Sequence, residues 1–214
     1  MLIATYLLSA FTEGGWVNAV QTLAFVSTLL LALRNALVPK RIARAGIAAV
    51  LAGSAVAVGL VLSHPSDAVL GGAQIWTGLI LLATVIVIVR RILADTSVTL
   101  QSIYAALSAY MIIGLMFAAF YAAMNRLGSG PFFANGSPGN SRTFQYFSFT
   151  TLTTLGYGDF TAAGSAGRAV AVMEAMAGQI FLATLVARLV SAFRPGRPPE
   201  PPEAGEPRDR ATPQ

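Results

Sequence analysis

The chain alternates long runs of apolar residues with short polar segments that hold most of its charges. A helix of about 20 apolar residues crosses the hydrocarbon core of a bilayer. Runs near that length lie at residues 16–33, 43–62, 75–89, 98–124 and 167–190. The third run is the shortest, and we expect its helix to continue through Arg90 and Arg91, whose long side chains reach the interface. The pattern therefore predicts an all-α membrane protein with five transmembrane helices.

A shorter run lies between the fourth and fifth of these spans. Residues 142–153 are rich in aromatic residues and threonine, and they follow a polar loop that begins at residue 125. This run is too short to cross a bilayer, and Asn140 or Ser141 can cap a helix that starts here. Backbone that enters a membrane without crossing it must be buried in protein or line water. We therefore expect a re-entrant helix.

Composition supports the membrane assignment and narrows the chemistry. The 214 residues are 55% hydrophobic and 11% charged, which is typical of an integral membrane protein. The absence of cysteine excludes disulfides, thiolate metal sites and cysteine nucleophiles. All basic residues except Lys40 are arginines, a composition that favours a prokaryotic source. The net charge of +5 does not indicate a nucleic-acid partner, because the basic residues sit near the ends of the predicted spans, at the edges of a lipid bilayer.

The basic residues also predict the orientation. Most of them lie after the first, third and fifth spans, namely Arg34, Lys40, Arg41, Arg44, Arg90, Arg91, Arg188, Arg194, Arg197, Arg208 and Arg210. Only Arg126, Arg142 and Arg168 fall on the other side. Cytoplasmic loops carry an excess of basic residues. We therefore expect a multi-pass protein of the cell membrane with its N-terminus outside and its C-terminus in the cytoplasm.

The chain divides into three predicted parts. Residues 1–95 form a three-helix transmembrane region whose role the sequence does not indicate. Residues 96–193 hold the fourth span, the short helix, the segment that follows it and the fifth span. Residues 194–214 are rich in proline and carry balanced charge, so we expect a disordered cytoplasmic tail.

The most specific motif follows the short helix. It reads Thr153-Thr154-Leu155-Gly156-Tyr157-Gly158-Asp159. A dehydrated cation needs oxygen dipoles to replace its water shell, and backbone carbonyls that point the same way supply them. Such an arrangement forces alternate residues into conformations that Gly156 and Gly158 adopt at little steric cost. The Thr154 hydroxyl adds one more oxygen at the inner end.

This run resembles the selectivity filter of the potassium-channel pore family, which reads T-V-G-Y-G-D in most members and T-L-G-Y-G-D in a minority. The resemblance extends from about residue 100 to residue 190. It implies that K+ is bound by the backbone carbonyls of Thr154, Leu155, Gly156 and Tyr157, with Gly158 completing the filter. Because such a pathway uses four loops and this chain has one, the resemblance implies a homotetramer. K+ is then the permeant ion, and no cofactor is expected.

Four residues are candidates to support the filter. They are Thr153, Asp159, Tyr146 and Glu174. The Tyr146 hydroxyl is placed to bond Asp159, although packing alone explains the ring equally well. Glu174 is an acidic residue deep within a predicted span, and such residues are functional candidates. We expect it to face the short helix and accept from Thr150 or Thr151, a bracing role that we favour over ion ligand or proton sensor.

The last span carries candidate cavity and gate residues. Gly178 matches the family's spacing for a hinge glycine, but small residues also let membrane helices approach closely, so both readings stay open. Gln179, Leu182, Val186 and Val190 share one helical face, and by the resemblance they line the cavity. The three apolar ones are candidates for a constriction that closes by dewetting.

The leading hypothesis is a potassium-selective channel that conducts passively. Steep voltage gating is not expected, because the first three spans lack the repeated interior Arg or Lys of a voltage sensor. The alternatives left open are a weakly selective pore, a non-conducting protein with the same fold, and a subunit of a potassium transporter. An enzyme is the least favoured class, since Glu174 and His64 lie far apart in the predicted topology and form no catalytic pair.

Overall fold

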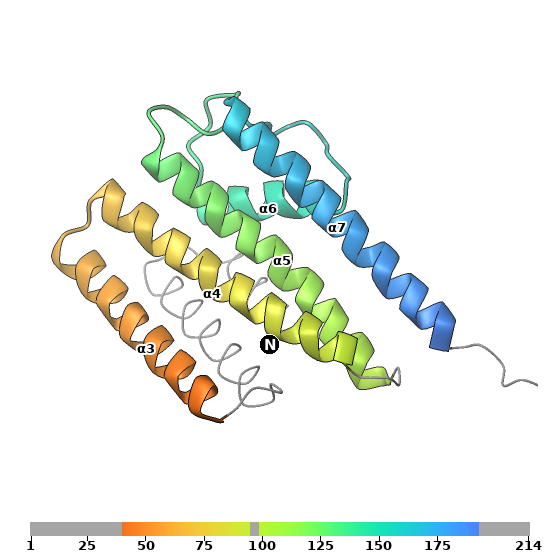
Figure 1. Ribbon diagram of the computed structural model, residues 1–214. Helices are drawn as coiled ribbons and strands as arrows, with labels where there is room; N and C mark the ends of the chain where they lie inside the picture. The colour runs from red at the N-terminus through yellow and green to blue at the C-terminus, as the bar shows by residue number, and fades with distance from the viewer. Residues whose placement is uncertain (1–39, 95–98, 193–214) are drawn as a thin grey trace, which may run out of the picture.

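The computed structural model describes residues 40–94 and 99–192. This part of the chain forms five helices and contains no strand. The helices are α3 (Lys40–Ser63), α4 (Asp67–Ala94), α5 (Leu100–Leu127), α6 (Ser141–Leu152) and α7 (Ser165–Ala192) (Figure 1). Four of them, all except α6, are long and apolar enough to cross a membrane. The predicted first span at 16–33 and the predicted tail at 194–214 lie outside the described residues.

The predicted spans match α3, α5 and α7 closely, but the prediction for α4 was wrong at its start. The predicted third span began at residue 75, whereas α4 already begins at Asp67, so that only residues 64–66 connect it to α3. Gly71 lies against α5 so closely that a Cβ there would be 2.7 Å from the Leu127 side chain. Close helix packing at this glycine therefore overrides its weak intrinsic helix propensity.

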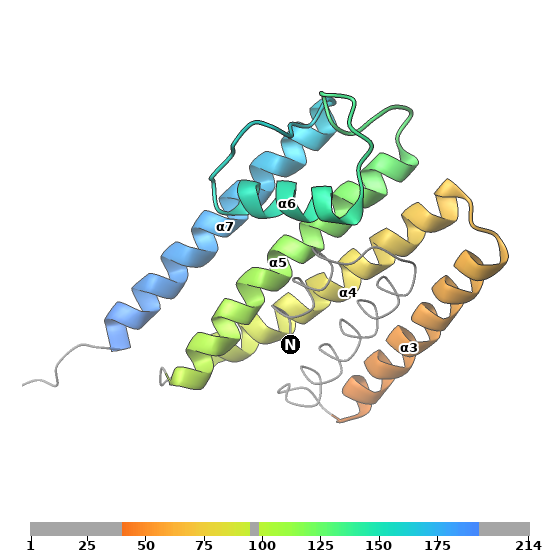
Figure 2. The same cartoon turned by 180° about the vertical axis from the view of Figure 1, so that it is seen from behind.

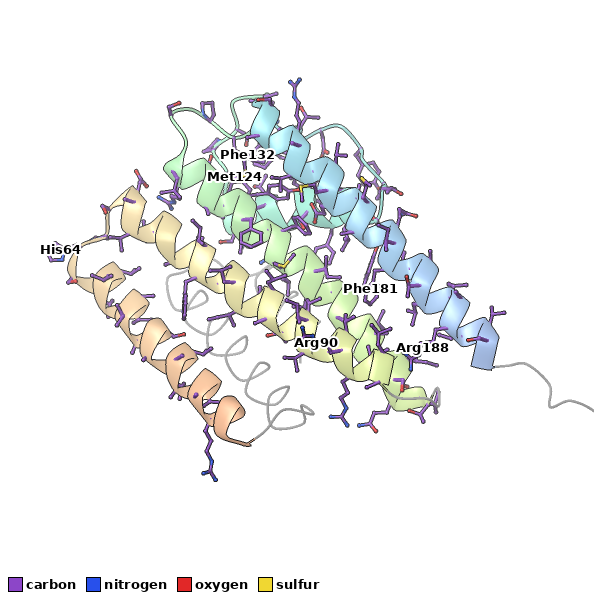
Figure 3. All side chains as sticks on the ribbon, viewed as in Figure 1. His64, Arg90, Met124, Phe132, Phe181 and Arg188 are labelled. Atoms are coloured by element: carbon purple, nitrogen blue, oxygen red, sulfur yellow. The ribbon has the colours of Figure 1, made fainter. Side chains whose placement is uncertain are left out.

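The helices lie side by side, with α4 and α5 forming an antiparallel pair (Figures 1 and 2). Helix α3 flanks α4, and the short α6 lies between the upper halves of α5 and α7. His64 marks the turn between α3 and α4, and Arg90 and Arg188 lie toward the opposite end of the bundle (Figure 3). At the His64 end, Arg126 forms a salt bridge of 2.8 Å with Asp67, joining the end of α5 to the start of α4.

One buried cluster runs through the middle of the bundle. It contains Leu81 from α4, Ile112 and Leu115 from α5, and Leu152 from the end of α6. The core thus crosses the predicted boundary near residue 95, which itself falls in the segment 95–98 outside the description. The division into an N-terminal region and a second unit stays a prediction, but α4 packs as part of the same core as α6.

A second cluster, which we call the outer aromatic cluster, lies nearer the His64 end. Its aromatic members are Tyr121, Phe132, Phe133, Phe144 and Phe147, with Phe160 packed against them. Two backbone hydrogen bonds tie the loop before α6 to the segment after residue 159: Ala134 donates to Thr161 (2.8 Å) and Ala163 donates to Phe132 (2.9 Å). The cluster therefore fixes both ends of the chain segment that contains α6.

Helix α7 is covered by little of its own chain. Among its described residues, only Gly167, Glu174 and Gly178 are at buried positions. Its exposed large apolar side chains are Val172, Met173, Met176, Ile180, Leu182, Val186 and Val190. An exposed apolar surface of this extent marks a region that contacts lipid or another protein.

Candidate functional site

The site is built on α6, which is held by α5 on one side and α7 on the other. A Cβ on Gly114 of α5 would lie 2.7 Å from the Phe149 ring, and a Cβ on Gly178 of α7 would lie 2.5 Å from the Leu152 carbonyl oxygen. The Tyr110 hydroxyl donates to that same oxygen at 3.2 Å. Two glycines and one phenol thus set the position at which α6 ends.

Helix α6 begins where the sequence predicted a cap. The Asn140 side chain accepts a hydrogen bond from the Thr143 amide at 2.9 Å, which satisfies one of the free donors of the first turn. At the other end Thr153 is the C-cap, and both its amide and its hydroxyl donate to the Phe149 carbonyl, at 3.1 and 2.7 Å. The chain then leaves the helix at a defined point and direction.

The next three amides turn back onto the end of α6. Thr154 donates to Thr151 (2.9 Å), while Leu155 (2.8 Å) and Gly156 (3.1 Å) both donate to Thr150. The amides of Thr154, Leu155 and Gly156 are therefore used. Within the described residues, no backbone amide donates to the carbonyl oxygens of Thr154, Leu155, Gly156 and Tyr157.

The backbone angles of this segment alternate in sign. Thr154, Gly156 and Gly158 have φ values of 57°, 50° and 81°, and Leu155 and Tyr157 between them are not in the positive region. Thr154 is the one residue other than glycine with positive φ in the described part of the chain. A left-handed conformation costs an L-residue roughly 1–2 kcal/mol, and strain of this kind gathers at functional sites.

The alternation has a direct geometric consequence. In a regular extended chain successive carbonyls point to opposite sides. When every second residue has a left-handed backbone conformation with positive φ, successive carbonyls turn toward the same side. The segment from Thr154 to Gly158 therefore presents a row of carbonyl oxygens, a set of ligands suited to a hard cation. The Thr154 hydroxyl at present donates to the Thr153 carbonyl at 2.7 Å.

The outer end of the segment is tied by two side chains. The Tyr146 hydroxyl bonds the Asp159 carboxylate, and this bond raises the pKa of Tyr146. Its ring stacks on that of Tyr157, with centroids 6.4 Å apart and planes 5° apart. The Asn135 amide donates to the Asp159 carbonyl at 3.0 Å, while its own oxygen accepts from Ser137 at 2.9 Å.

Asn135 is a site residue that our sequence reasoning missed. Asn-Gly is a turn signal, and Gly136 does adopt a positive φ of 72°. That signal predicts a turn, but it gives no indication that the asparagine side chain reaches a residue far along the chain. Only the folded loop brings Asn135 to Asp159.

Glu174 faces α6, as expected, but its predicted partners were wrong. The side chain is fully buried, and Tyr121 of α5 donates to its Oε2 at 2.6 Å. Its Oε1 contacts the Ser148 hydroxyl of α6. Thr150 instead donates to the Phe147 carbonyl of its own helix at 3.0 Å. Helical spacing places Ser148 on the face of α6 that meets α7.

The structure gives Gly178 a packing role, and the hinge reading stays a prediction. The four proposed cavity residues of α7, Gln179, Leu182, Val186 and Val190, are all exposed in the single chain. Phe147 of α6, unlike these exposed residues of α7, is buried. It belongs to the outer aromatic cluster, and its ring lies 5.0 Å from that of Tyr121.

Comparison with models of protein families identifies part of the chain. Residues 117–194 match the model of a protein family described as "Ion channel", which covers the end of α5, all of α6 and all of α7. No curated protein and no solved structure matches the chain. The match confirms the resemblance inferred from the motif for this part of the chain. Together with four membrane-length helices, it supports a multi-pass membrane protein in which residues 117–194 belong to the ion-channel class.

Proposed function

Taking residues 117–194 as part of an ion-channel family, we propose that the protein is a potassium-selective channel that conducts passively. The observation that carries the proposal is the row of carbonyls from Thr154 to Tyr157. The sign of φ alternates along this segment, and no backbone amide of the described residues donates to these oxygens. In this proposal the segment is the selectivity filter and α6 is the pore helix. The C-terminal end of α6, from which the segment leaves, adds a partial negative charge that favours a cation.

The proposal requires a homotetramer. One chain supplies one row of carbonyls, and a dehydrated K+ needs oxygen ligands on all sides. The single chain leaves Leu155 55% and Tyr157 67% exposed, although both belong to the same segment. Neighbouring copies placed around a common axis would cover these side chains and the apolar length of α7. In that assembly Gln179, Leu182, Val186 and Val190 line the cavity and its cytoplasmic gate.

The supporting residues take defined roles in this proposal. Asn135, Tyr146 and Asp159 hold the outer mouth, while Thr153 and Glu174 hold the inner end and the back of α6. The end of the bundle that holds Arg90 and Arg188, opposite His64, faces the cytoplasm in this proposal. Together with the predicted span at 16–33, this orientation puts the N-terminus outside the cell and the C-terminus inside.

The alternatives are a non-selective pore, a non-conducting protein of the same fold, and a transporter subunit. In a weakly selective pore we expect the tyrosine ring that supports the filter to be lost. Here the ring of Tyr157 is present and stacks on that of Tyr146, which argues against a non-selective pore. A transporter of this type uses four unequal loops in one chain, usually with one glycine each, whereas this loop keeps Gly156 and Gly158.

The proposal is tested by ion flux into liposomes that contain the purified protein. We expect K+ flux that exceeds Na+ flux and is lost in Gly156→Ala, because alanine at φ 50° is strained by roughly 1–2 kcal/mol in each subunit. Gly130→Ala is the matched control, since a Cβ there meets no atom of the described part of the chain within 4 Å and its φ is not positive. Equal K+ and Na+ fluxes would contradict selectivity, and a folded tetramer without flux would favour the non-conducting alternative.

A second prediction concerns alkaline pH and Tyr146. The bond to Asp159 raises the Tyr146 pKa, because the neutral phenol is the form that donates to the carboxylate. Its contribution is complete below the unfolded-state pKa of about 10 and is lost as the pH rises through the higher folded-state pKa. Selectivity should therefore hold up to about pH 10 and fall above it.

The Tyr146→Phe variant should show reduced selectivity already at neutral pH and no further alkaline loss. Flux ratios measured across this pH range check the prediction. Tyr104→Phe, which removes the hydroxyl of an exposed tyrosine on α5, should keep the wild-type pH profile. If Tyr146→Phe lost as much selectivity above about pH 10 as the wild type does, a group other than Tyr146 would be responsible for the pH dependence.

A further inference from the structure

The buried carboxyl of Glu174 lies where three helices meet. It belongs to α7, its Oε2 accepts from Tyr121 of α5, and its Oε1 contacts Ser148 of α6. The Ser148 hydroxyl makes a second contact, 2.6 Å from the Gly114 carbonyl oxygen of α5. The result is a chain of three short contacts: Tyr121 to Glu174, Glu174 to Ser148, and Ser148 to Gly114.

Counting protons along this chain decides the state of the carboxyl. Each of the three oxygen pairs needs one proton between its atoms to be a hydrogen bond. The Tyr121 and Ser148 hydroxyls supply two, and the Gly114 carbonyl supplies none. If Glu174 were ionised, Ser148 would satisfy either Glu174 or Gly114, and the other pair would be two oxygens in contact without a proton. A proton on Oε1 completes the set, with Glu174 donating to Ser148 and Ser148 donating to Gly114.

The surroundings of the carboxyl agree with this count. Its described partners are hydroxyl groups, and the titratable side chains that face it are Tyr110 and Tyr121, both from α5. Arg168, on the same helix, directs its Nε to the Ala162 carbonyl at 3.0 Å, and Arg126 pairs with Asp67. The side chain has no exposed surface. A buried charge without a paired cation is strongly unfavourable in a membrane protein.

We propose that Glu174 is a proton-binding site, occupied at neutral pH, whose carboxylic acid links α5, α6 and α7 as a hydrogen-bond donor. One proton per subunit thereby joins the back of α6 to both neighbouring helices without placing a charge there. Glu174 is a positioning residue, since it touches none of the carbonyls proposed to bind K+. Its effect on conduction rests on the proposed channel function, whereas its protonation does not.

Infrared spectroscopy of the full-length protein in liposomes at pH 7 tests the protonation directly. A protonated carboxylic acid absorbs in a region where ionised carboxylates do not. We expect this band in the wild type, its loss in Glu174→Gln, and a frequency shift in Tyr121→Phe, which removes the hydrogen bond to Oε2. Loss of a carboxylate band in Glu174→Gln, with no acid band in the wild type, would overturn the proposal.

Two variants separate the donor role from a general effect on folding. A glutamine amide reproduces the bonding of the neutral acid, since its oxygen accepts from Tyr121 and its nitrogen donates to Ser148. Glu174→Gln should therefore keep the wild-type melting temperature and K+ flux, whereas Glu174→Leu should lose both. A melting temperature for Glu174→Gln as low as that of Glu174→Leu would contradict the neutral acid. If the wild type itself conducts no K+, the channel proposal fails, and the infrared band and melting temperatures still decide the state of Glu174.

Discussion

Replacing Gly178 by alanine is expected to abolish K+ flux and to destabilise the protein. The added Cβ would lie 2.5 Å from the Leu152 carbonyl oxygen and 2.9 Å from a methyl carbon of the same residue. The carbonyl is backbone, so it cannot turn aside as the end of a flexible side chain can. Either α7 or the end of α6 must shift, and overpacking of this kind costs about 1–3 kcal/mol. A shift of α6 moves the carbonyls of Thr150 and Thr151, to which the amides of the filter segment are bonded.

Gly72→Ala is the matched control. Gly72 is also a helical glycine in a membrane-length helix, but a Cβ there meets no atom of residues 40–94 and 99–192 within 4 Å. Alanine is the better helix former by about 1 kcal/mol, so the two variants should change stability in opposite directions. Thermal unfolding in detergent and K+ flux measure both effects. A Gly178→Ala protein with wild-type stability and altered gating would instead favour the hinge reading of this glycine.

Replacing Phe133 by alanine is expected to give the largest loss of stability. Phe133 is fully buried at the centre of the outer aromatic cluster. Its ring stacks on Phe144 at 5.2 Å and meets the edges of Phe132 and Phe160, both at 5.1 Å. Truncating a buried phenylalanine costs about 3–5 kcal/mol, because transfer and cavity terms add.

The loss at Phe133 should also reach the filter segment. Phe133 pairs with Ala162 in an isolated bridge, and the flanking bonds fix the loop that carries Asn135 to Asp159. K+ selectivity should therefore fall together with the unfolding temperature. Tyr104→Ala is the control, since this aromatic side chain of α5 is 67% exposed. Similar losses of stability in the two variants would contradict the role assigned to the cluster.

The features that the sequence predicted well are those set by local pattern. Long apolar runs gave α3, α5 and α7 because a membrane leaves a helix few other ways to bond its backbone. The Asn140 cap and the short length of α6 also follow from neighbouring residues. Gly156 and Gly158 were identified because their positive φ values reflect a property of the residue type itself.

What the sequence could not predict depends on contacts between distant segments. The first two turns of α4 look like a loop, since Gly71 and Gly72 are poor helix formers. Ser66 caps these turns by accepting from the Val69 amide at 3.3 Å, and Leu127 of α5 packs against Gly71. The partners of Glu174 come from two other helices, and their distances from it depend on how α6 is rotated. Thr154 carries a positive φ that its residue type disfavours, and the bond from its amide to the end of α6 holds it there.

The bare surface of α7 makes folding and assembly a single event in the proposed tetramer. A side chain such as Val186, 59% exposed in one chain, then becomes an interior residue of the complex. Replacing Val186 by a smaller residue would then lower the free energy of unfolding as a core mutation does, although Val186 lies on the surface of the isolated chain. Dilution would destabilise such an assembly, as heating does, because the stability that comes from contacts between subunits depends on protein concentration. For the proposed tetramer, a single unfolding temperature therefore has a meaning only at a stated protein concentration.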